Sequence, residues 1–486
     1  MVKEKIENIG TEHLSIQVGH INTSILSQSI SLKDVALIDQ TGKFDVQLKK
    51  IKLTGVHIFE LLMHNTIEIG EISIQSPEIK INQQTPQLVA SNKKGLRRSF
   101  PTLKIHELNV ENGTFLLRDS ISGADSIFSF LFDAQIKDID SQSQSGDSLN
   151  EIPKFENITI NISRLNYKEQ SGSYRFTIDQ CQLNTSLKQL TINQAECTPI
   201  LSKYEIGRKT GVETDWFNIT IKQIRLNGFK IDNLIRQESL KLQSVQIDQF
   251  VGETFIDKRL PSPQKPDSKI PSDLFRLPSI PYSCDSIIIN RASIRYSERA
   301  ENSTEAGFID FNQINATILN ITNNDSLPNL PIKMTAEAKI MNEAILSAEF
   351  QFATPGMSHL NTVSGNLKPM RFQSLNSVVK PNMGAQIQSG TINHLDFKFT
   401  YDDNHASGKL VMDYEDLKIV FLNQEKKRKK QVESLVANSI IIRSHNIPDQ
   451  KYYRKGTINF ERDKKRSFFS FWWKSVLSGI QSIVVN

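Results

Sequence analysis

The stretch that decides the fold is FDVQLKKIKLTGVHIFELLMHNTIEIGEISI, from Phe44 to Ile74. Shifted by 173 residues, it falls without a gap on Phe217–Ile247, whose sequence is FNITIKQIRLNGFKIDNLIRQESLKLQSVQI. Eight of the 31 positions are identical, and thirteen are apolar in both copies. Gly55 and Gly228 hold the same place in the two copies. The apolar spacing that the copies share around these glycines indicates an internal duplication.

Apolar and polar residues alternate within both copies, which predicts β-strands with one apolar face and one polar face. Two apolar sets of the first copy share one spacing: Ile67, Ile69, Ile72, Ile74, Ile79 and Ile81, and Leu103, Ile105, Leu108, Val110, Phe115 and Leu117. With a shift of 179 residues, the latter set falls on Tyr282, Cys284, Ile287, Ile289, Ile294 and Tyr296. One supersecondary unit is therefore used several times within the larger repeat.

These patterns predict a mainly β fold, an elongated, curved, repetitive antiparallel β-sheet with a taco-like groove. A few short helices, including turns at Val56–Met63 and Phe229–Arg236, and a C-terminal amphipathic helix complete it. The predicted parts are a first β-repeat unit over residues 1–175, a second over 176–370, and a C-terminal β segment with the terminal helix over 371–486. Two similar β domains from a simple duplication are the alternative to one continuous stack.

Composition restricts the class of partner. The chain of 486 residues is 38% hydrophobic and 23% charged, so it can form a core. Much of its formal net charge of +5 lies after residue 425, including the run Lys426–Lys430, so we expect no nucleic-acid partner. No apolar stretch reaches the roughly 18 residues of a membrane span. The cysteines Cys181, Cys197 and Cys284 are expected to be small buried hydrophobes, with a Cys181–Cys197 bridge as the alternative.

No catalytic signature is visible in the sequence. The nine histidines follow no metal-ligand spacing, and no Cys-x-x-Cys, phosphate loop or Gly-x-Ser-x-Gly elbow occurs. Asp138 and Asp140 begin something like a calcium loop, but the later ligand positions do not fit. We therefore expect no catalytic residues, no cofactor and no metal site, and hence not an enzyme.

The last twenty residues carry an apolar face at helical spacing behind a basic collar of Arg462, Lys464, Lys465 and Arg466. Aromatic residues beside basic ones suit the membrane interface, where rings lie at headgroup level and cations meet anionic lipid. The membrane-interface candidates are Phe468, Phe469, Phe471, Trp472, Trp473 and Lys474. The alternative is a helix that caps the end of the β-stack and covers its last edge.

Several motifs also follow one another in a familiar order. Near the C-terminus these are Gly408-x-x-x-Met412-x-Tyr414, Asp416–Ile419, Ala437-Asn438-x-Ile440-Ile441, Arg454-x-Gly456, Glu461-Arg462-Asp463, Ser467-Phe468-Phe469 and Trp473-Lys474-Ser475. Near the N-terminus they are Phe59-x-Leu61-Leu62, Ile67–Ile74 and Pro77-Glu78-Ile79. Their order resembles the AsmA-like family of the Bacteroidetes type, which is similar to TamB and to the bridge-like lipid-transfer proteins.

The resemblance implies a long curved sheet whose apolar groove holds phospholipid or other acyl chains. It also implies a periplasmic protein anchored in the inner membrane through an N-terminal helix, which we expect to precede Met1. The family supplies no catalytic residues.

We therefore expect a lipid-binding or lipid-transfer protein of the Gram-negative envelope, with a role in outer-membrane biogenesis. The alternative is a non-catalytic structural scaffold or outer-membrane assembly factor with a closed β core. The expected partners are phospholipid or other acyl lipids, a membrane surface and envelope proteins. The groove is expected to be lined by Ile67, Ile69, Ile72, Ile74, Leu103, Ile105, Leu108, Val110, Leu240, Leu242, Val245, Ile247, Ile287 and Ile289.

Overall fold

The computed structural model describes eleven ranges of the chain: residues 14–24, 26–57, 66–83, 102–119, 126–141, 154–231, 239–263, 267–324, 330–353, 360–422 and 442–485. The chain divides into two compact units, unit 1 (Met1–Glu196) and unit 2 (Cys197–Asn486). The division into 1–175, 176–370 and 371–486 stays a prediction. The helical turns predicted at Val56–Met63 and Phe229–Arg236 and the basic run Lys426–Lys430 fall wholly or partly outside the described ranges.

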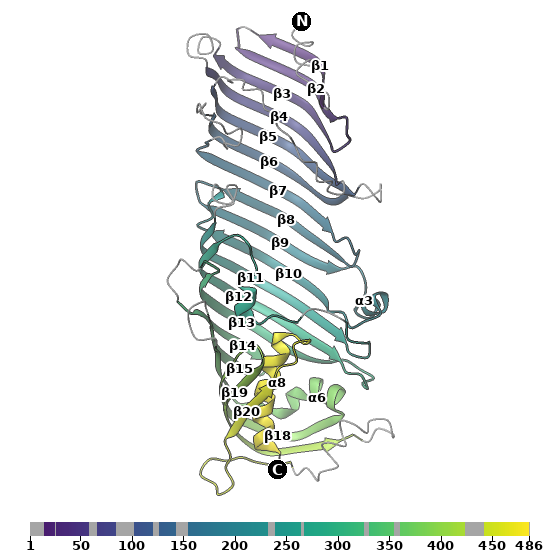
Figure 1. The fold of residues 1–486 in the computed structure, drawn as a ribbon, viewed down its shortest axis with the longest axis vertical. Helices are drawn as coiled ribbons and strands as arrows, with labels where there is room; N and C mark the ends of the chain where they lie inside the picture. Colours follow the sequence, from purple (N-terminus) through teal and green to yellow (C-terminus); the bar gives the residue numbers. More distant parts are fainter. Residues whose placement is uncertain are drawn as a thin grey trace. The chain divides into compact units, whose positions relative to one another are not determined.

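Unit 1 is built from strands that pair in chain order (Figure 1). They are β1 (Leu14–Ser24), β2 (Ser29–Asp39), β3 (Phe44–His57), β4 (Thr66–Gln83), β5 (Thr102–Asp119), β6 (Ser126–Ser141), β7 (Asn157–Lys168) and β8 (Tyr174–Asn184), with β9 (Gln189–Pro199) at the boundary. The extensive contacts among these described elements are all between neighbours within the sheet. The described part of unit 1 is therefore a single layer.

Unit 2 combines a sheet with helices that pack on it. Its strands are β10 (Trp216–Asn227), β11 (Leu240–Asp257), β12 (Tyr282–Arg299), β13 (Gly307–Thr322), β14 (Ile332–Ile340), β15 (Ala344–Phe352), β16 (Asn361–Leu367), β17 (Met370–Arg371), β18 (Ala385–Tyr401), β19 (His405–Phe421) and β20 (Gly456–Glu461). Its helices are α3 (Lys203–Thr210), α5 (Pro271–Leu274), η1 (Phe372–Leu375), α6 (Asn376–Met383) and α8 (Phe468–Val484). The predicted mainly β class, with few short helices and a C-terminal helix, is confirmed.

The sheets are mixed, which corrects the antiparallel prediction. β4 pairs in parallel with β5, and β11 pairs in parallel with β12, while the other strand pairs described are antiparallel. A parallel pair needs a connection of about a dozen residues or more. Such connections are present between Gln83 and Thr102 and between Asp257 and Tyr282.

Parallel pairing explains the internal echo in the sequence. Ile67 lies opposite Leu103, and Ile72 lies opposite Leu108, so the two sets of equal spacing are partners in one ladder. The second copy has the same register, with Leu240 opposite Tyr282. Strand pairing is thus repeated along with the sequence.

A line of backbone kinks, the first crease, crosses unit 1. Asp34, Ser76 and Asn112 all have positive φ, at 53°, 49° and 55°. The pairing register of β2–β5 is interrupted at these positions, which lie beside one another on neighbouring strands. Gln249 and Arg291 repeat the kink in unit 2, at φ values of 53° each. Because L-residues adopt this conformation at a cost, its recurrence in successive strands marks a built-in bend.

A second crease passes through Gly55 and Asp138, whose φ values are 64° and 52°. Gly70 and His106 lie between them and are skipped in the ladders of β3–β6. In unit 2, Gly228 has a φ of 78° at the position equivalent to Gly55. Each long strand of the repeat is therefore bent at two places.

The creases keep most apolar residues of the long strands on one face. β6 alternates regularly from Phe128 to Ile136, so Phe132 and Ala134 point to the same side. Phe132 lies opposite Gly113 and Ala134 lies opposite Val110, although Val110 and Gly113 are three residues apart. The crease between Val110 and Gly113 turns the strand, so that both residues point to the same face although their spacing is odd. The uneven apolar spacing in the sequence thus produces one continuous apolar face.

Replacing Gly228 by alanine should destabilise unit 2 by about 2 kcal/mol, because a positive φ costs roughly 1–2 kcal/mol for an L-residue and a clash is added. A Cβ at Gly228 would lie 2.8 Å from the backbone nitrogen of Gln243. The matched control is Gly211→Ala, where φ is 72° and nothing lies within 4 Å. Urea unfolding should show the larger loss for Gly228→Ala; equal losses would contradict the tight packing inferred at the crease.

His106 connects three strands at the second crease. Its Nε2 lies 2.9 Å from Glu68 Oε1 on β4, and its Nδ1 lies 3.2 Å from Asp138 Oδ1 on β6. Hydrogen bonds to Glu68 and then to Asp138 raise the pKa of His106. The protonated ring therefore favours the folded state.

Stability should depend on the protonation of His106. Because its folded pKa is raised, its contribution is complete below the unfolded value near 6.5 and is lost as pH rises through the folded pKa. Thermal melts of wild type and His106→Gln should therefore differ most near pH 6 and converge above about pH 8. His20→Gln, at an exposed histidine of β1, is the control. A difference that grows with pH would contradict this assignment.

Candidate functional site

The apolar face of unit 1 contains all eight groove residues predicted there. Ile69 and Ile105 are buried, and the other six side chains are half-buried. They form cross-strand rows, because Ile72 pairs with Leu53 and Leu108, and Ile74 pairs with Ile51 and Val110. Half-buried side chains in such rows shield one another sideways. In the part of unit 1 that the structure describes, no second layer covers them.

In unit 2, some of the equivalent residues are covered by other parts of the chain. Leu242, Val245 and Ile287 pack against a cluster that contains Cys284 and Phe352. Phe275, which follows α5, lies over this cluster with its ring 5.6 Å from that of Phe352. The other predicted groove residues there, Leu240, Ile247 and Ile289, are half-buried. Part of the apolar face of unit 2 is thus already covered by the chain itself.

Helix α8 covers another part of that face (Figure 1). It packs on β19 and β20 through Phe471, Ser475, Gly479 and Ile483, which follow one another every four residues and are buried. A Cβ on Gly479 would lie 2.8 Å from Ile458 Cγ1. The small residues in this stripe let the helix approach the sheet closely.

The predicted membrane-interface residues occupy different environments. Phe471 is buried, its ring 5.8 Å from that of Tyr401. Trp472 is half-buried, its ring 4.7 Å from that of Phe350 on β15. Phe468 is half-buried beside Trp472, while Phe469 and Trp473 are 36% and 39% exposed. Most of this aromatic group therefore covers the sheet, and two rings are left at the surface.

Lys474 is half-buried on α8. Burial lowers the pKa of its ammonium group, and the nearby positive charge of Lys258 lowers it further. Lys258 is itself paired with Glu298 at 2.6 Å. The helix thus places one cation over the sheet next to an existing ion pair.

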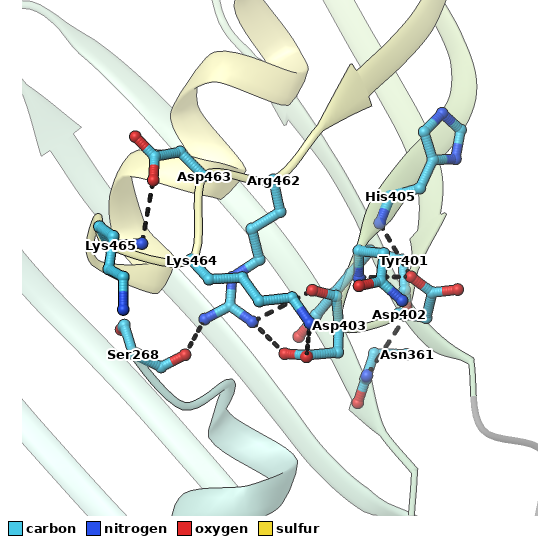
Figure 2. A network of polar contacts seen from close by, with 11 residues as sticks. Ser268, Asn361, Tyr401, Asp402, Asp403, His405, Arg462, Asp463, Lys464 and Lys465 are labelled. Carbon is cyan, nitrogen blue, oxygen red and sulfur yellow. Dashed lines mark hydrogen bonds and ion pairs between the residues drawn. The ribbon is translucent and has the colours of Figure 1, made fainter. Parts of the chain in front are cut away.

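The basic collar is bound to acidic residues of the same unit. Figure 2 shows Arg462 and Lys464 converging on Asp403, in the turn between β18 and β19. Lys464 Nζ lies 2.6 Å from Asp403 Oδ2. Two further pairs follow, Lys465–Asp267 at 2.8 Å and Arg466–Glu213 at 2.6 Å. These contacts favour the capping interpretation of the terminal helix.

Arg462 is the most enclosed member of the collar. Its side chain is 0% exposed, and its guanidinium pairs with the Asp403 carboxylate and donates to the carbonyl oxygen of Ser268. It also lies 5.8 Å from the centre of the Phe471 ring. Arg462 therefore joins the β18–β19 turn, the connection before α5, and the start of α8.

A depression of about 610 Å³ lies across β12–β16 and β18. Its lining includes small residues such as Ala316, Ala336 and Ala348 and the carboxylates of Glu337 and Asp396. None of its lining residues is a histidine, lysine or arginine. Ile289, a predicted groove residue, also lines it. Direct strand partners continue its row across the depression through Ala316, Ala336, Ala348, Gly365 and Phe397. The small side chains of this row leave the hollow, so the depression is part of the apolar face of unit 2.

Within the described ranges, none of the helices combines the length and the hydropathy of a membrane span. No group of three or more His, Cys, Asp or Glu side chains there could hold a metal ion. No disulfide joins any two of Cys181, Cys197 and Cys284, so the alternative Cys181–Cys197 bridge is not formed.

The signals that sequence reasoning missed are the crease residues and the ion-pair partners of the collar. Asp34, Ser76 and Asn112 are polar residues, and Asp and Asn adopt a positive φ more often than other L-residues. Residue type alone nevertheless does not identify a bend. Asp403 and Asp267 lie far from the collar in the sequence.

Comparison with known proteins gives no family. No protein-family model matches the chain, and no curated protein is found to be related to it.

Replacing Asp403 by asparagine should loosen α8, because it leaves the enclosed Arg462 guanidinium without its carboxylate. Arg462 is enclosed but the Asp403 carboxylate is 44% exposed, so the loss should lie between that of a surface pair and that of a fully buried pair, at about 1–3 kcal/mol. Asp267→Asn is the control, because its pair with Lys465 is more than half exposed on both sides and should cost less than about 1 kcal/mol. Urea unfolding followed by the fluorescence of Trp472 and Trp473 reports on the helix. Similar losses in the two variants would contradict the role given to Arg462.

Proposed function

We propose that this protein binds lipids and holds their acyl chains against the apolar face of its β-sheet. The observation that carries the proposal is the apolar face of unit 1, where rows of half-buried side chains cross β1–β8 without a covering layer in the described ranges. A sheet with one apolar face needs something to cover that face. An acyl chain can provide the cover without any specific headgroup contact.

The energetics suit this ligand. Burial of one methylene is worth about 0.8 kcal/mol, so a chain of sixteen carbons gains roughly 12 kcal/mol when fully covered and about half of that on an open face. Strands lie about 4.8 Å apart, which makes the face of eight strands on the order of 35 Å across. That is wide enough for extended chains to lie across many strands.

In the cell, we propose that the protein works in the Gram-negative envelope, in the periplasm, with phospholipid or another acyl lipid as its ligand. A membrane surface and envelope proteins would be its other partners. This part of the proposal rests on the resemblance described above, and the protein is proposed to be no enzyme.

The second candidate is a non-catalytic scaffold or outer-membrane assembly factor. The observation that favours it is the filled core of unit 2, where α8 packs on β19 and β20, and Tyr401, Leu410, Met412 and Ile458 are almost fully buried. In that case the apolar face of unit 1 would bind protein, and no lipid would move.

The face-specific contact with lipid can be tested by photocrosslinking. A benzoylphenylalanine placed at Ile72, on the apolar face, should crosslink to bound phospholipid during expression. The same group at Ser73, the next residue of β4 and therefore on the opposite face, is the control.

Crosslinks to lipid at Ile72 but not at Ser73 are expected. Equal crosslinking at the two positions, or crosslinks to protein alone at Ile72, would sink the acyl-chain proposal. The latter result would favour the scaffold.

A further inference from the structure

One region of the apolar face of unit 1 is aromatic instead of aliphatic. Six side chains from β5–β8 form it, and we call it the aromatic platform: Phe115, Phe128, Phe130, Phe132, Tyr167 and Phe176. Each ring has a neighbouring ring in the platform within about 6 Å. Direct strand partners place them on one face, because Phe115 lies opposite Phe130, and Tyr167 lies opposite both Phe128 and Phe176.

A stacked pair forms the centre of the platform. The rings of Phe115 and Phe130 face each other, with centroids 4.8 Å apart and planes 16° apart, so their edges are left for a ring above the sheet. Beside them, Phe132 lies against Gly113, where a Cβ would be only 2.5 Å from the ring. The absence of a side chain at Gly113 therefore gives the Phe132 ring its place. All six rings are half-buried, so part of each remains accessible.

The second copy shows what can occupy this place. Ile294 and Phe311 pair in unit 2 as Phe115 and Phe130 pair in unit 1, and the 179-residue shift makes Ile294 the equivalent of Phe115. There, the ring of Phe469 from α8 lies 5.9 Å from that of Phe311, edge to face at 86°. It also lies 5.8 Å from the ring of Tyr296 on the neighbouring pair. In unit 2 the equivalent position is thus covered by a planar ring.

We propose that the aromatic platform of unit 1 is a binding site for a lipid that carries a planar conjugated ring on an apolar chain. The ring would lie over Phe115 and Phe130, where Phe469 lies in unit 2, and the chain would continue along the aliphatic rows. Stacked and edge-to-face contacts between rings add affinity beyond the area that they bury, whereas a saturated chain gains area alone. This inference deepens the proposed lipid-binding function. The placement of the apolar chain rests on that function, whereas the placement of the ring does not.

The test compares two competitors on the full chain. Displacement of a fluorescent fatty acid is measured with 2-methyl-3-decyl-1,4-naphthoquinone and with decyldecalin, its saturated counterpart. The quinone should compete about tenfold better, as two ring contacts imply. In the double variant Phe115→Leu with Phe130→Leu, the ratio of quinone affinity to decyldecalin affinity should fall to about one, whatever the change in fatty-acid affinity.

A matched variant changes aliphatic residues of the same face, Ile72→Leu with Val110→Leu, and should keep the advantage of the quinone. Equal competition by the two probes on wild type would overturn the proposal, as would equal losses in both variants. Because fatty-acid binding reports the fold of each variant, a misfolded protein is recognised directly.

Equilibrium dialysis of the quinone, followed by its absorbance, separates this inference from the function proposed above. Quinone binding that depends on Phe115 and Phe130, without fatty-acid binding, would support the platform and contradict the acyl groove. If a peptide of residues 467–485 binds the platform and the quinone does not, the inference is wrong and the platform takes an aromatic helix.

Discussion

The structure depends on one constraint: a sheet that gathers most of its apolar residues on one face must have that face covered. Antiparallel sheets commonly solve this by packing one face on a core. Unit 2 follows that solution with α8 and the residues around α5, which cover the Cys284 cluster and the sheet near β20. Unit 1 has the same alternation and the same strand register, yet its described residues form one layer. Both units therefore have an apolar face of the same kind, and they differ in whether chain segments of the same unit pack on it.

The creases make the shared face possible. A strand of 18 residues such as β4 would turn its apolar residues away from one face wherever their spacing changes from two to an odd number. Left-handed residues at Ser76 and Asn112, and a glycine at Gly55, take up that change in neighbouring strands. Their recurrence at Gln249, Arg291 and Gly228 shows that the duplicated unit includes its bends. Backbone strain of this kind persists only where the surrounding ladder fixes it.

Much of this fold could be predicted from sequence, because alternation and repetition are local signals. The strand positions around Phe44–Ile74, the apolar sets and the terminal helix were all visible. The parallel pairs were not foreseen, although the equal spacing of Ile67–Ile81 and Leu103–Leu117 contained their register. Which apolar residues become covered was also out of reach, because it depends on distant contacts such as Arg462 with Asp403. Aromatic residues on α8 carried the same signal for a membrane and for a sheet, and only their neighbours distinguish the two uses.

The proposed roles all require an apolar face that accepts a ligand. Native mass spectrometry of the protein purified without detergent, combined with organic extraction of what co-purifies, tests this most directly. We predict phospholipid or another acyl lipid bound at one or more molecules per chain, and its loss when the apolar face of unit 1 is made polar. A bare chain that also takes up no fluorescent lipid would contradict lipid binding and would leave a scaffold whose apolar face binds protein.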